Sequence, residues 1–416
     1  MYIKFCIKPG LIAALITATV IYSAAIKADS TGFKLKRWLI ENVDNHPSVL
    51  AAQAAVDAAL FQLNAADKAL YNPELEIGAE TAETDSAYIG LIQTIDWGDT
   101  RGARTEMAGS HKAATQFAYE SARRTIAVEL LSNLSDYHTS SALKSLAEQG
   151  NRLMQRSAKL AKQRFDAGDL GKVDVDLANL SYAQARFKLA DAITLHAKAK
   201  QNLAALTGSI SSDWPEMLSS YPDPETETPE VTKTVQQLPK MREITSRVNA
   251  AKSNIKVQKG QGTAQPTFAL RAGREEEDTL LGFTFLVPLQ VRNNFQAQVD
   301  AAYAESIQVE QEAMNTYRKL RSRLEIATVS YRLSREAWLA WEQSGADTLS
   351  EQITLLERLW KSGEMSTTDY LIQLTQALET KASAIEHRGR MWTDWSEWLI
   401  ASGKIDHWLL KSTREQ

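Results

Sequence analysis

The chain has 416 residues, enough for two or three ordinary domains or for one very elongated domain. Its 47 lysines and arginines nearly balance its 51 aspartates and glutamates, so it lacks the basic surplus that marks a nucleic-acid-binding protein. A mean hydropathy of -0.31 excludes a bundle of membrane-spanning helices.

Residues 1–28 have the pattern of a secretory signal peptide. Lys4 and Lys8 lie near the start, and an apolar run over residues 11–25 follows and ends in small residues. An uncleaved anchor helix is the alternative, although the apolar run is short for a membrane span. The only cysteine, Cys6, lies in this segment. The exported chain would therefore hold no disulfide and would depend on packing or oligomerisation.

Two long tracts without proline are the places where long helices can form. No proline lies between Pro73 and Pro215 or after Pro288, and proline breaks helix interiors. The tracts are rich in Ala, Leu, Lys, Glu, Gln and Arg, which favour helices. Leucines recur every seven residues from Leu146 to Leu160, a spacing typical of coiled coils. An amphipathic helix in a globular core would give the same stripe.

Four segments alternate apolar and polar residues in the manner of strands, at about 72–82, 86–97, 266–274 and 279–288. Strands of about ten residues with this alternation are typical of membrane β-barrels, whose apolar face meets lipid. The predicted lipid-facing residues are Leu75, Ile77, Ile89, Leu91, Phe268, Leu270, Phe283 and Phe285. Two hairpins packed on a soluble core are the alternative.

Four strands in one chain cannot close a membrane barrel. They leave two unpaired edges, and the backbone groups of an unpaired edge cannot face lipid. The smallest closed membrane barrels have about eight strands. Closure therefore requires several copies of the chain, and three copies would give twelve strands. The sequence predicts an oligomer without counting its members.

The chain is predicted to be an internal duplication. Residues recur 195 positions later in the same helical context, pairing Gly150 with Gly345, Gly168 with Gly363, Asp174 with Asp369 and Gly208 with Gly403. The expected divisions are a first repeat at 29–208, a linker at 209–238, a second repeat at 239–403 and a C-terminal tail at 404–416. Each repeat should contain a helix, two strands and a long helical hairpin that turns at 166–171 or at 361–366.

Several short phrases, in order, carry a resemblance to a known family. They are His46-Pro47, Asn72-Pro73-Glu74-Leu75, Gln93-Thr94-Ile95-Asp96-Trp97-Gly98, Arg164-Phe165 with Gly168 and Asp174, the repeat of that hairpin at Gly363 and Asp369, and Leu206-Thr207-Gly208. Over roughly residues 38–403 the chain resembles the TolC family of outer-membrane efflux proteins.

The resemblance implies a mainly α fold with a small β part. Three chains would form a twelve-stranded barrel in the outer membrane and an α-barrel of helical hairpins in the periplasm. The implied partners are two further copies of the chain, a periplasmic membrane-fusion adaptor, an inner-membrane pump of the RND type and outer-membrane lipid.

The resemblance also assigns roles at the turns of the hairpins. The residues implied to form the adaptor-docking tips are Phe165, Gly168, Trp360 and Gly363. The acids that follow the tips are candidates for narrowing the closed pore, and they are Asp174, Asp176 and Asp369. Ordinary negative charge at a helix N-terminus is the alternative for these acids. Ile372 stands where some relatives carry another acid.

The implied function is a passive outer-membrane duct that exports small solutes. The Asn-Pro-Glu-Leu and Gln-Thr-Ile-Asp-Trp-Gly phrases look most like outer-membrane subunits of heavy-metal cation efflux systems of the cobalt-zinc-cadmium type. One alternative is the outer-membrane duct of a type I protein or peptide secretion system. Another, of a different class, is a soluble periplasmic coiled-coil scaffold or adaptor.

The residues suggest no catalytic, metal or cofactor site, so an enzyme is not expected. The six histidines include no pair three or four positions apart, and neither a phosphate loop nor a nucleophile elbow occurs. The C-terminal tryptophans could suggest a ligand cage, but their spacing favours a packing stripe on a helix. They are Trp392, Trp395, Trp398 and Trp408.

Overall fold

The computed structural model describes residues 32–410 except 82–84, 210–212, 219–220 and 224–229. The predicted signal peptide lies outside the described residues. The chain divides into two compact units. The sheet unit comprises Pro47–Ala122 and Glu230–Ser322, and the hairpin unit comprises the segment up to His46, Arg123–Pro229 and the segment from Arg323 onward. Each unit therefore combines residues from both predicted repeats.

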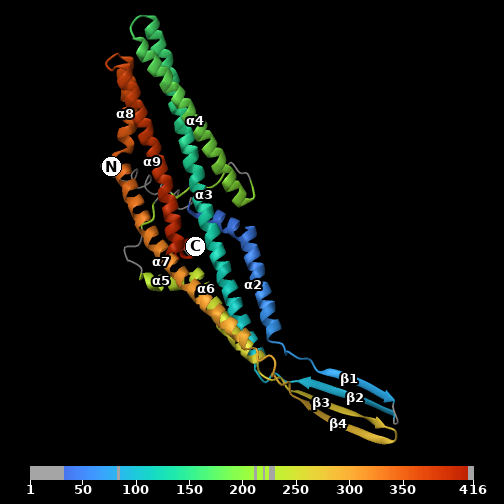
Figure 1. Cartoon of the computed structure of the whole chain (residues 1–416). Helices are drawn as coiled ribbons and strands as arrows, with labels where there is room; N and C mark the ends of the chain where they lie inside the picture. Colours follow the sequence, from blue (N-terminus) through green and yellow to red (C-terminus); the bar gives the residue numbers. More distant parts are fainter. Residues whose placement is uncertain (1–31, 82–84, 210–212, 219–220, 224–229, 411–416) are drawn as a thin grey trace, which may run out of the picture. The chain divides into compact units, whose positions relative to one another are not determined.

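The sheet unit contains one antiparallel sheet in the order β1-β2-β3-β4 (Figure 1). Its strands are β1 (Glu74–Thr81), β2 (Asp85–Thr94), β3 (Thr267–Glu275) and β4 (Asp278–Leu286). Its other elements are α2 (Pro47–Ala66), α5 (Val231–Gln237), α6 (Pro239–Gln261) and the first parts of α3 (Thr100–Asp166) and α7 (Gln296–Ser344). The predicted fold class, mainly helical with four strands per chain, is confirmed.

The register of the sheet follows the apolar pattern of the sequence. Leu75 pairs with Leu91, Leu91 with Leu270, and Leu270 with Phe283. Paired residues point to the same face of a sheet, and a slip of one residue would move each apolar side chain to the other face. The two hairpins therefore pair so that their apolar faces coincide.

The hairpin unit contains the later parts of α3 and α7 and the paired helices that turn back along them. Residues 32–44 are helical. The remaining helices are α4 (Lys172–Thr207), α8 (Ala346–Lys361), α9 (Thr367–Ala401) and α10 (Ile405–Leu410). Trp395 is fully buried, and its ring packs edge-on against Trp408 at 4.9 Å between centroids. Burial of Trp392, Trp395 and Trp398 confirms that the tryptophan stripe packs.

The two hairpin turns have the same backbone structure. Gly168 and Gly363 are in the left-handed conformation, with φ of 83° and 78°. The amide of Gly168 donates to the carbonyl of Phe165, and that of Asp169 donates to the carbonyl of Arg164. The amides of Gly363 and Glu364 make the same two bonds to residues three and five positions earlier. Glycine is favoured here because the left-handed conformation that closes each helix strains residues with a Cβ.

The second repeat differs from the first in one respect that the sequence did not predict. Helix α3 is continuous, whereas its counterpart is divided into α7 and α8 at Gly345. A Cβ at Gly345 would collide with the ring of Trp341. The indole thus occupies the space that a side chain at this position would need. Glycine is also a poor helix former.

The expected linker and tail both contain packed structure. Helix α5 lies in the segment predicted as linker, and Trp214 and Met217 of the same segment are buried. The ring of Trp214 meets Tyr137 edge-on at 4.7 Å. In the expected tail, Ile405 of α10 is fully buried. The composition of the linker segment predicted a spacer, because the few apolar residues that are buried stand among many polar ones.

Candidate functional site

One face of the sheet is apolar and exposed in the single chain. All eight predicted lipid-facing residues lie on this face, because the register places them side by side. Ile77 is 77% exposed and Phe283 64% exposed, while Phe268 is half-buried against the ring of Phe285 at 4.8 Å. Leu281, 78% exposed, belongs to the same face. An apolar surface of this kind needs a cover, since soluble proteins rarely leave one open to water.

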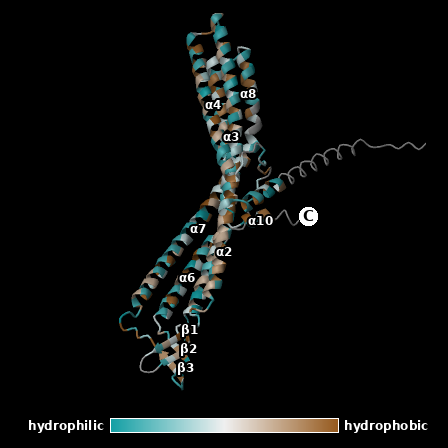
Figure 2. Cartoon of the chain, turned by 90° about the vertical axis from the view of Figure 1, so that its right-hand side faces the viewer, coloured by the Kyte–Doolittle hydropathy of each residue, from teal (hydrophilic) through white to brown (hydrophobic). Residues whose placement is uncertain are grey.

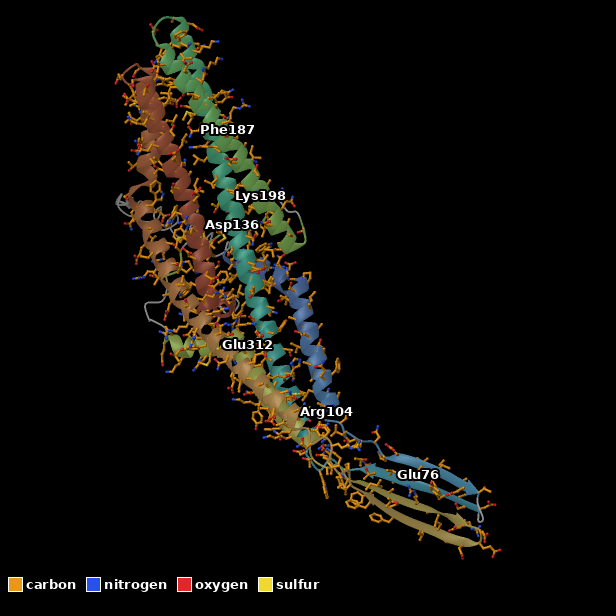
Figure 3. All side chains as sticks on the ribbon, in the orientation of Figure 1. Glu76, Arg104, Asp136, Phe187, Lys198 and Glu312 are labelled. Atoms are coloured by element: carbon orange, nitrogen blue, oxygen red, sulfur yellow. The ribbon has the colours of Figure 1, made fainter. Side chains whose placement is uncertain are left out.

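The opposite face carries a polar cluster with one residue from each strand. Arg271 of β3 donates from Nε to Oε2 of Glu76 in β1 at 2.7 Å and from Nη2 to Oε1 at 3.2 Å. Its Nη1 donates to the hydroxyl of Thr284 in β4 at 3.2 Å, and Tyr88 of β2 donates to Glu76 at 3.4 Å. Glu76 is labelled on the sheet in Figure 3. The cluster ties the four strands together across the sheet.

Glycines make room for this cluster. A Cβ at Gly78 would collide with the ring of Tyr88, and one at Gly90 would lie 3.0 Å from Cγ of Arg271. Both long side chains can therefore lie close over the backbone of neighbouring strands. A residue without a side chain beside an aromatic or long side chain is a known way to fix strand pairing.

Three of the four residues predicted to form the adaptor-docking tips are exposed, and one is buried. Gly168 and Gly363 are exposed, and no atom lies within 4 Å of where a Cβ would stand. Phe165 is 41% exposed, but its counterpart Trp360 is only 2% exposed. The assignment of Trp360 to a docking surface is therefore corrected, because its ring stacks on Tyr370 at 4.4 Å and its Nε1 donates to the Thr367 hydroxyl.

Arg164, which the sequence analysis named only as part of a family phrase and gave no role, joins the two tips. Arg164, in the last turn of α3, donates from Nη2 to the carbonyls of Trp360 and Lys361 at 3.3 and 3.2 Å. These carbonyls lie at the end of α8, where helix carbonyls lose their usual intrahelical donors, and the carbonyl of Trp360 also accepts from the Gly363 amide. A cation at a helix C-terminus is also favoured by the helix dipole. A basic residue in the last turn of α3 indicates a helix-capping role from sequence alone, but the carbonyls that Arg164 caps belong to α8, far away in the sequence.

The three acids beyond the tips have different surroundings. Asp174 is half-buried, and its Oδ1 accepts a hydrogen bond from the Thr368 hydroxyl at 3.2 Å. Asp369 is exposed and accepts at Oδ2 from the Ser366 hydroxyl, which in turn accepts from the Asp369 amide. Asp176 is exposed. Asp174 and Asp369 thus stabilise the starts of α4 and α9, as helix N-terminal charge would.

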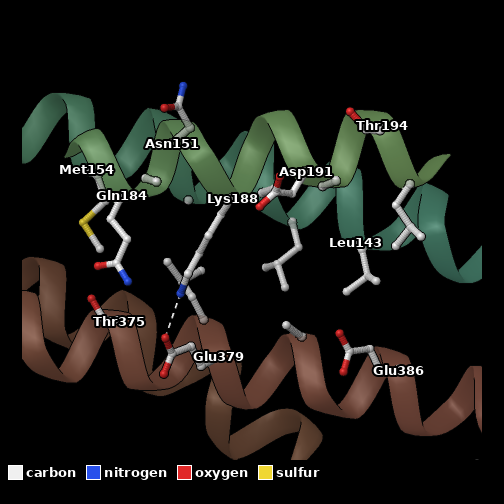
Figure 4. A pocket seen from close by; sticks show the side chains of 18 of the residues that line it. Leu143, Asn151, Met154, Gln184, Lys188, Asp191, Thr194, Thr375, Glu379 and Glu386 are labelled. Atoms are coloured by element: carbon white, nitrogen blue, oxygen red, sulfur yellow. Dashed lines mark hydrogen bonds and ion pairs between the residues drawn. The ribbon is translucent and has the colours of Figure 1, made fainter. Parts of the chain in front are cut away.

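A groove of about 550 Å³ lies between α3, α4 and α9 in the hairpin unit. One ion pair crosses it, from Lys188 Nζ on α4 to Glu379 Oε1 on α9 at 2.7 Å (Figure 4). Both side chains are about half exposed, so the pair contributes little to stability. Leu143 and Met154 of α3 are among its apolar walls. Within the described part of the chain, no group of three or more His, Cys, Asp or Glu residues could hold a metal ion.

Comparison with known proteins gives a family for part of the chain and a fold for nearly all of it. Residues 38–209 match the family described as "Outer membrane efflux protein". A membrane protein from Pseudomonas aeruginosa has a TM-score of 0.75 and 16% identity, covering 89% of this chain and 93% of its own. The CmeC outer membrane channel of Campylobacter jejuni has a TM-score of 0.74 and 14% identity, with 89% and 85% covered.

Two further structures share the fold. The outer membrane protein VceC from Vibrio cholerae has a TM-score of 0.73 and 15% identity, covering 89% of this chain and 96% of its own. CusC, whose structures describe transmembrane channel formation, has a TM-score of 0.73 and 15% identity, with 89% and 92% covered. No curated protein matches the sequence. The coverage shows that both repeats, and not only the family-matched segment, have this fold.

Proposed function

We propose that this chain is the subunit of an outer-membrane efflux channel, exported to the periplasm and assembled as a homotrimer. The observation that carries the proposal is a four-stranded sheet with one exposed apolar face and with two edges, β1 and β4, that have no partner strand among the described residues. Lipid would cover the apolar face, and neighbouring copies would pair with the edges. The match of residues 38–209 to outer membrane efflux proteins supports it.

Helix α2 adds a second reason to expect neighbouring copies. It is apolar enough and long enough to cross a membrane by length and composition (Figure 2 colours it by hydropathy). Only 22% of its most apolar window is buried in the single chain. Leu50 and Phe61 are 54% and 69% exposed. Contact with another subunit would remove this apolar surface from water without requiring a transmembrane helix.

Two adjacent leucines test the lipid-facing assignment. Leu281 lies on the apolar face, and Leu280 lies on the opposite face beside Gly273. Leu281→Asp should prevent assembly in the outer membrane, because a charge toward lipid is costly, whereas Leu280→Asp should be tolerated. Membrane fractionation and trimer bands on unheated gels give the result. Equal tolerance of both variants, or recovery of the unaltered chain without detergent, would favour a soluble scaffold.

The turns at Gly168 and Gly363 are the proposed contacts for a periplasmic adaptor, with Phe165 beside the first. The two tips share one backbone structure and expose both glycines. Gly363→Asn adds a side chain to open space with little strain, since Asn tolerates the left-handed conformation. We expect trimers to persist while export falls. Normal export by this variant and by Gly168→Asn together would reject the docking role.

Asp174, Asp176 and Asp369 are proposed to narrow the closed pore at the hairpin ends. Their position just after the tips, and the bond from Thr368 to Asp174 that joins α9 to α4, support the proposal. Asp176→Asn removes an exposed charge without removing a described contact. Single-channel conductance of the purified trimer should rise or change its ion preference. A trimer that conducts as the unaltered one does would leave these acids only a structural role.

The proposed cargo is a small solute, and heavy-metal cations are the class that the sequence phrases favour. An inner-membrane pump would supply the energy, and the RND type is the proposed partner. Deletion of the gene should increase sensitivity to cobalt, zinc or cadmium salts, and the plasmid-borne gene should restore growth. Unchanged metal sensitivity with loss of a secreted polypeptide would instead indicate a type I secretion duct.

A further inference from the structure

A second cavity of the hairpin unit, separate from the tips and from the groove of Figure 4, has the lining of a ligand site. It measures about 550 Å³ and lies among α3, α7, the start of α8, α9 and the segment containing Glu216 and Met217. Cavities of about 300–1,000 Å³ are the usual size for small-molecule sites. The binding proposed below is argued from this cavity alone, and only its test uses the membrane-inserted trimer of the function proposed above.

One stripe of α9 supplies both charge and an apolar surface to this cavity. Lys381, Ile385, Arg388 and Trp392 all line it, at spacings of four, three and four residues. This spacing places them on one face of a helix. The two cations are seven residues apart, about 10 Å along the axis, so their long side chains can reach a common anion.

Neither cation is paired with an acid in the part of the chain that the structure describes. Among the residues that the structure describes, Lys381 and Arg388 form no ion pair, and the guanidinium of Arg388 lies over the ring of Trp338 at 5.8 Å from its centroid. The acid that lines the cavity, Glu216, lies 3.7 Å from Nδ1 of His138 and is 79% exposed. The cavity therefore has an excess of positive charge beside aromatic surface.

Three indoles form an aromatic wall of the cavity, and two glycines let neighbouring side chains pack closely beside it. Trp338 and Trp341 of α7 and Trp392 of α9 all border the cavity. The ring of Trp341 occupies the space where a Cβ of Gly345 would stand, and Thr139 does the same at Gly389. Ser135 donates from its hydroxyl to the carbonyl of Gly389 at 3.1 Å, so α3 and α9 approach closely at this point. A rigid wall of indoles favours flat apolar ligands.

We infer that this cavity binds an amphipathic organic anion, with its carboxylate or sulfonate between Lys381 and Arg388 and its flat apolar body against Trp338, Trp341 and Trp392. Charge-assisted hydrogen bonds from the two cations hold the anionic group. The hydroxyl groups of Thr139 and Ser141 on α3 border the same space. The sequence analysis assigned the tryptophan stripe to packing alone. In the structure one of these tryptophans, Trp392, also lines the cavity.

Titration calorimetry on the full chain in phosphatidylcholine nanodiscs tests the inference, with 1-naphthalenesulfonate as the anionic probe and 1-naphthylmethylammonium as its cationic counterpart. We expect saturable binding of the sulfonate only. Lys381→Gln and Arg388→Gln should each weaken it about tenfold or more. Arg390→Gln, an equal charge change at an exposed position of the same helix that does not line the cavity, should leave it unchanged.

Three outcomes would overturn the inference. They are no saturable binding of the sulfonate, equal binding of the cationic probe, and equal losses in Arg388→Gln and Arg390→Gln. Trp338→Leu provides a check that does not change charge, because it removes part of the flat wall and should weaken the sulfonate at least severalfold. Circular dichroism and the trimer band confirm that each variant is folded before titration.

Discussion

The buried tip residue Trp360 allows a quantitative test of how the two repeats differ. Trp360→Ala removes a side chain that is 2% exposed and stacked on Tyr370 with the ring planes 2° apart. Burying a tryptophan removes about 150–250 Å² from water, which at about 25 cal/mol per Å² corresponds to about 4–6 kcal/mol. Measured Trp→Ala substitutions in cores cost about 3–5 kcal/mol. We therefore expect a loss of about 4 kcal/mol at this tip.

Hydrogen exchange resolves such a local loss. Some amides exchange only when the tip opens. A change of about 4 kcal/mol should lower their protection factors roughly a thousandfold. Amides near the end of α8 and the start of α9 should show it, while those of β1 to β4 should not change. Trp360→Phe keeps an aromatic ring against Tyr370 and should lose much less.

The counterpart in the first repeat is the matched control. Phe165 is 41% exposed, so Phe165→Ala should cost about 1 kcal/mol or less. The reasoning is refuted if Phe165→Ala opens its tip as much as Trp360→Ala opens the second one, or if Trp360→Ala leaves exchange unchanged. The first result would mean that the exposed fraction of these residues does not predict their contribution to tip stability, and the second that the indole does not hold the second tip together.

Three further predictions concern other parts of the chain. Burial alone would raise the pKa of Asp96, but the backbone amides of Arg101 and Thr100, at 2.7 and 2.9 Å, outweigh it and lower the pKa. The Asp96 carboxylate should stabilise the start of α3 fully above its ordinary pKa of 3.8, and this stabilisation should be lost as the pH falls through the lowered pKa. Asp96→Ala should cost about 1–2 kcal/mol, measured by hydrogen exchange of the amides in the first turn of α3. Burial, with Lys144 and Lys200 nearby, lowers the pKa of His196 below 6.5. The unfolded chain therefore binds a proton at His196 more readily than the folded chain, and the melting temperature should fall as pH drops from 7.5 to 5.5. The melting temperature of His196→Gln should depend less on pH. A Cβ at Gly273 would meet backbone atoms of Ala87 and Tyr88, whereas one at Gly282 would be 3.7 Å from Arg271 Cβ. Gly273→Ala should therefore abolish the trimer band on unheated gels, and Gly282→Ala should keep it.

The sequence predicted those features whose cause is local in the chain. Alternation along each strand fixes which residues share a face, and all eight predicted lipid-facing residues lie on one face of the sheet. The left-handed turns at Gly168 and Gly363 follow from glycine after a helix rich in leucine and basic residues. Such signals need no knowledge of a distant partner.

Features set by distant partners were missed. The acceptors of Arg164 are carbonyls almost two hundred residues away, and Trp214 is buried against Tyr137 across a segment that resembles a linker in composition. The role of Trp360 was misjudged for the same reason. Its place three residues before the tip glycine, where the resemblance implies a docking surface, suggested a surface residue, but burial depends on what each tip packs against.

The duplication explains why this misjudgement was possible. A repeated sequence predicts repeated backbone, and both hairpin turns do share their hydrogen bonds. It does not predict repeated burial, because the two hairpins of one chain need not have equivalent neighbours. In the hairpin unit the core near the tips includes Trp360 and Tyr370 from the second repeat beside Met154 and Ala158 from the first. Trp360 is thus buried at a position whose counterpart in the first repeat, Phe165, is 41% exposed.

The unpaired outer edges of the sheet also limit what the structure of a single chain can explain about the proposed channel. The backbone groups at the outer edges of β1 and β4 have no partner strand in the described sheet. Water could satisfy them, but lipid could not, so an apolar face and an open edge on the same sheet are incompatible in a membrane monomer. Adding strands of a second copy leaves one edge still open at each end. Only a ring of copies satisfies every edge, and for this reason the pore of the proposed channel would be a property of the assembly.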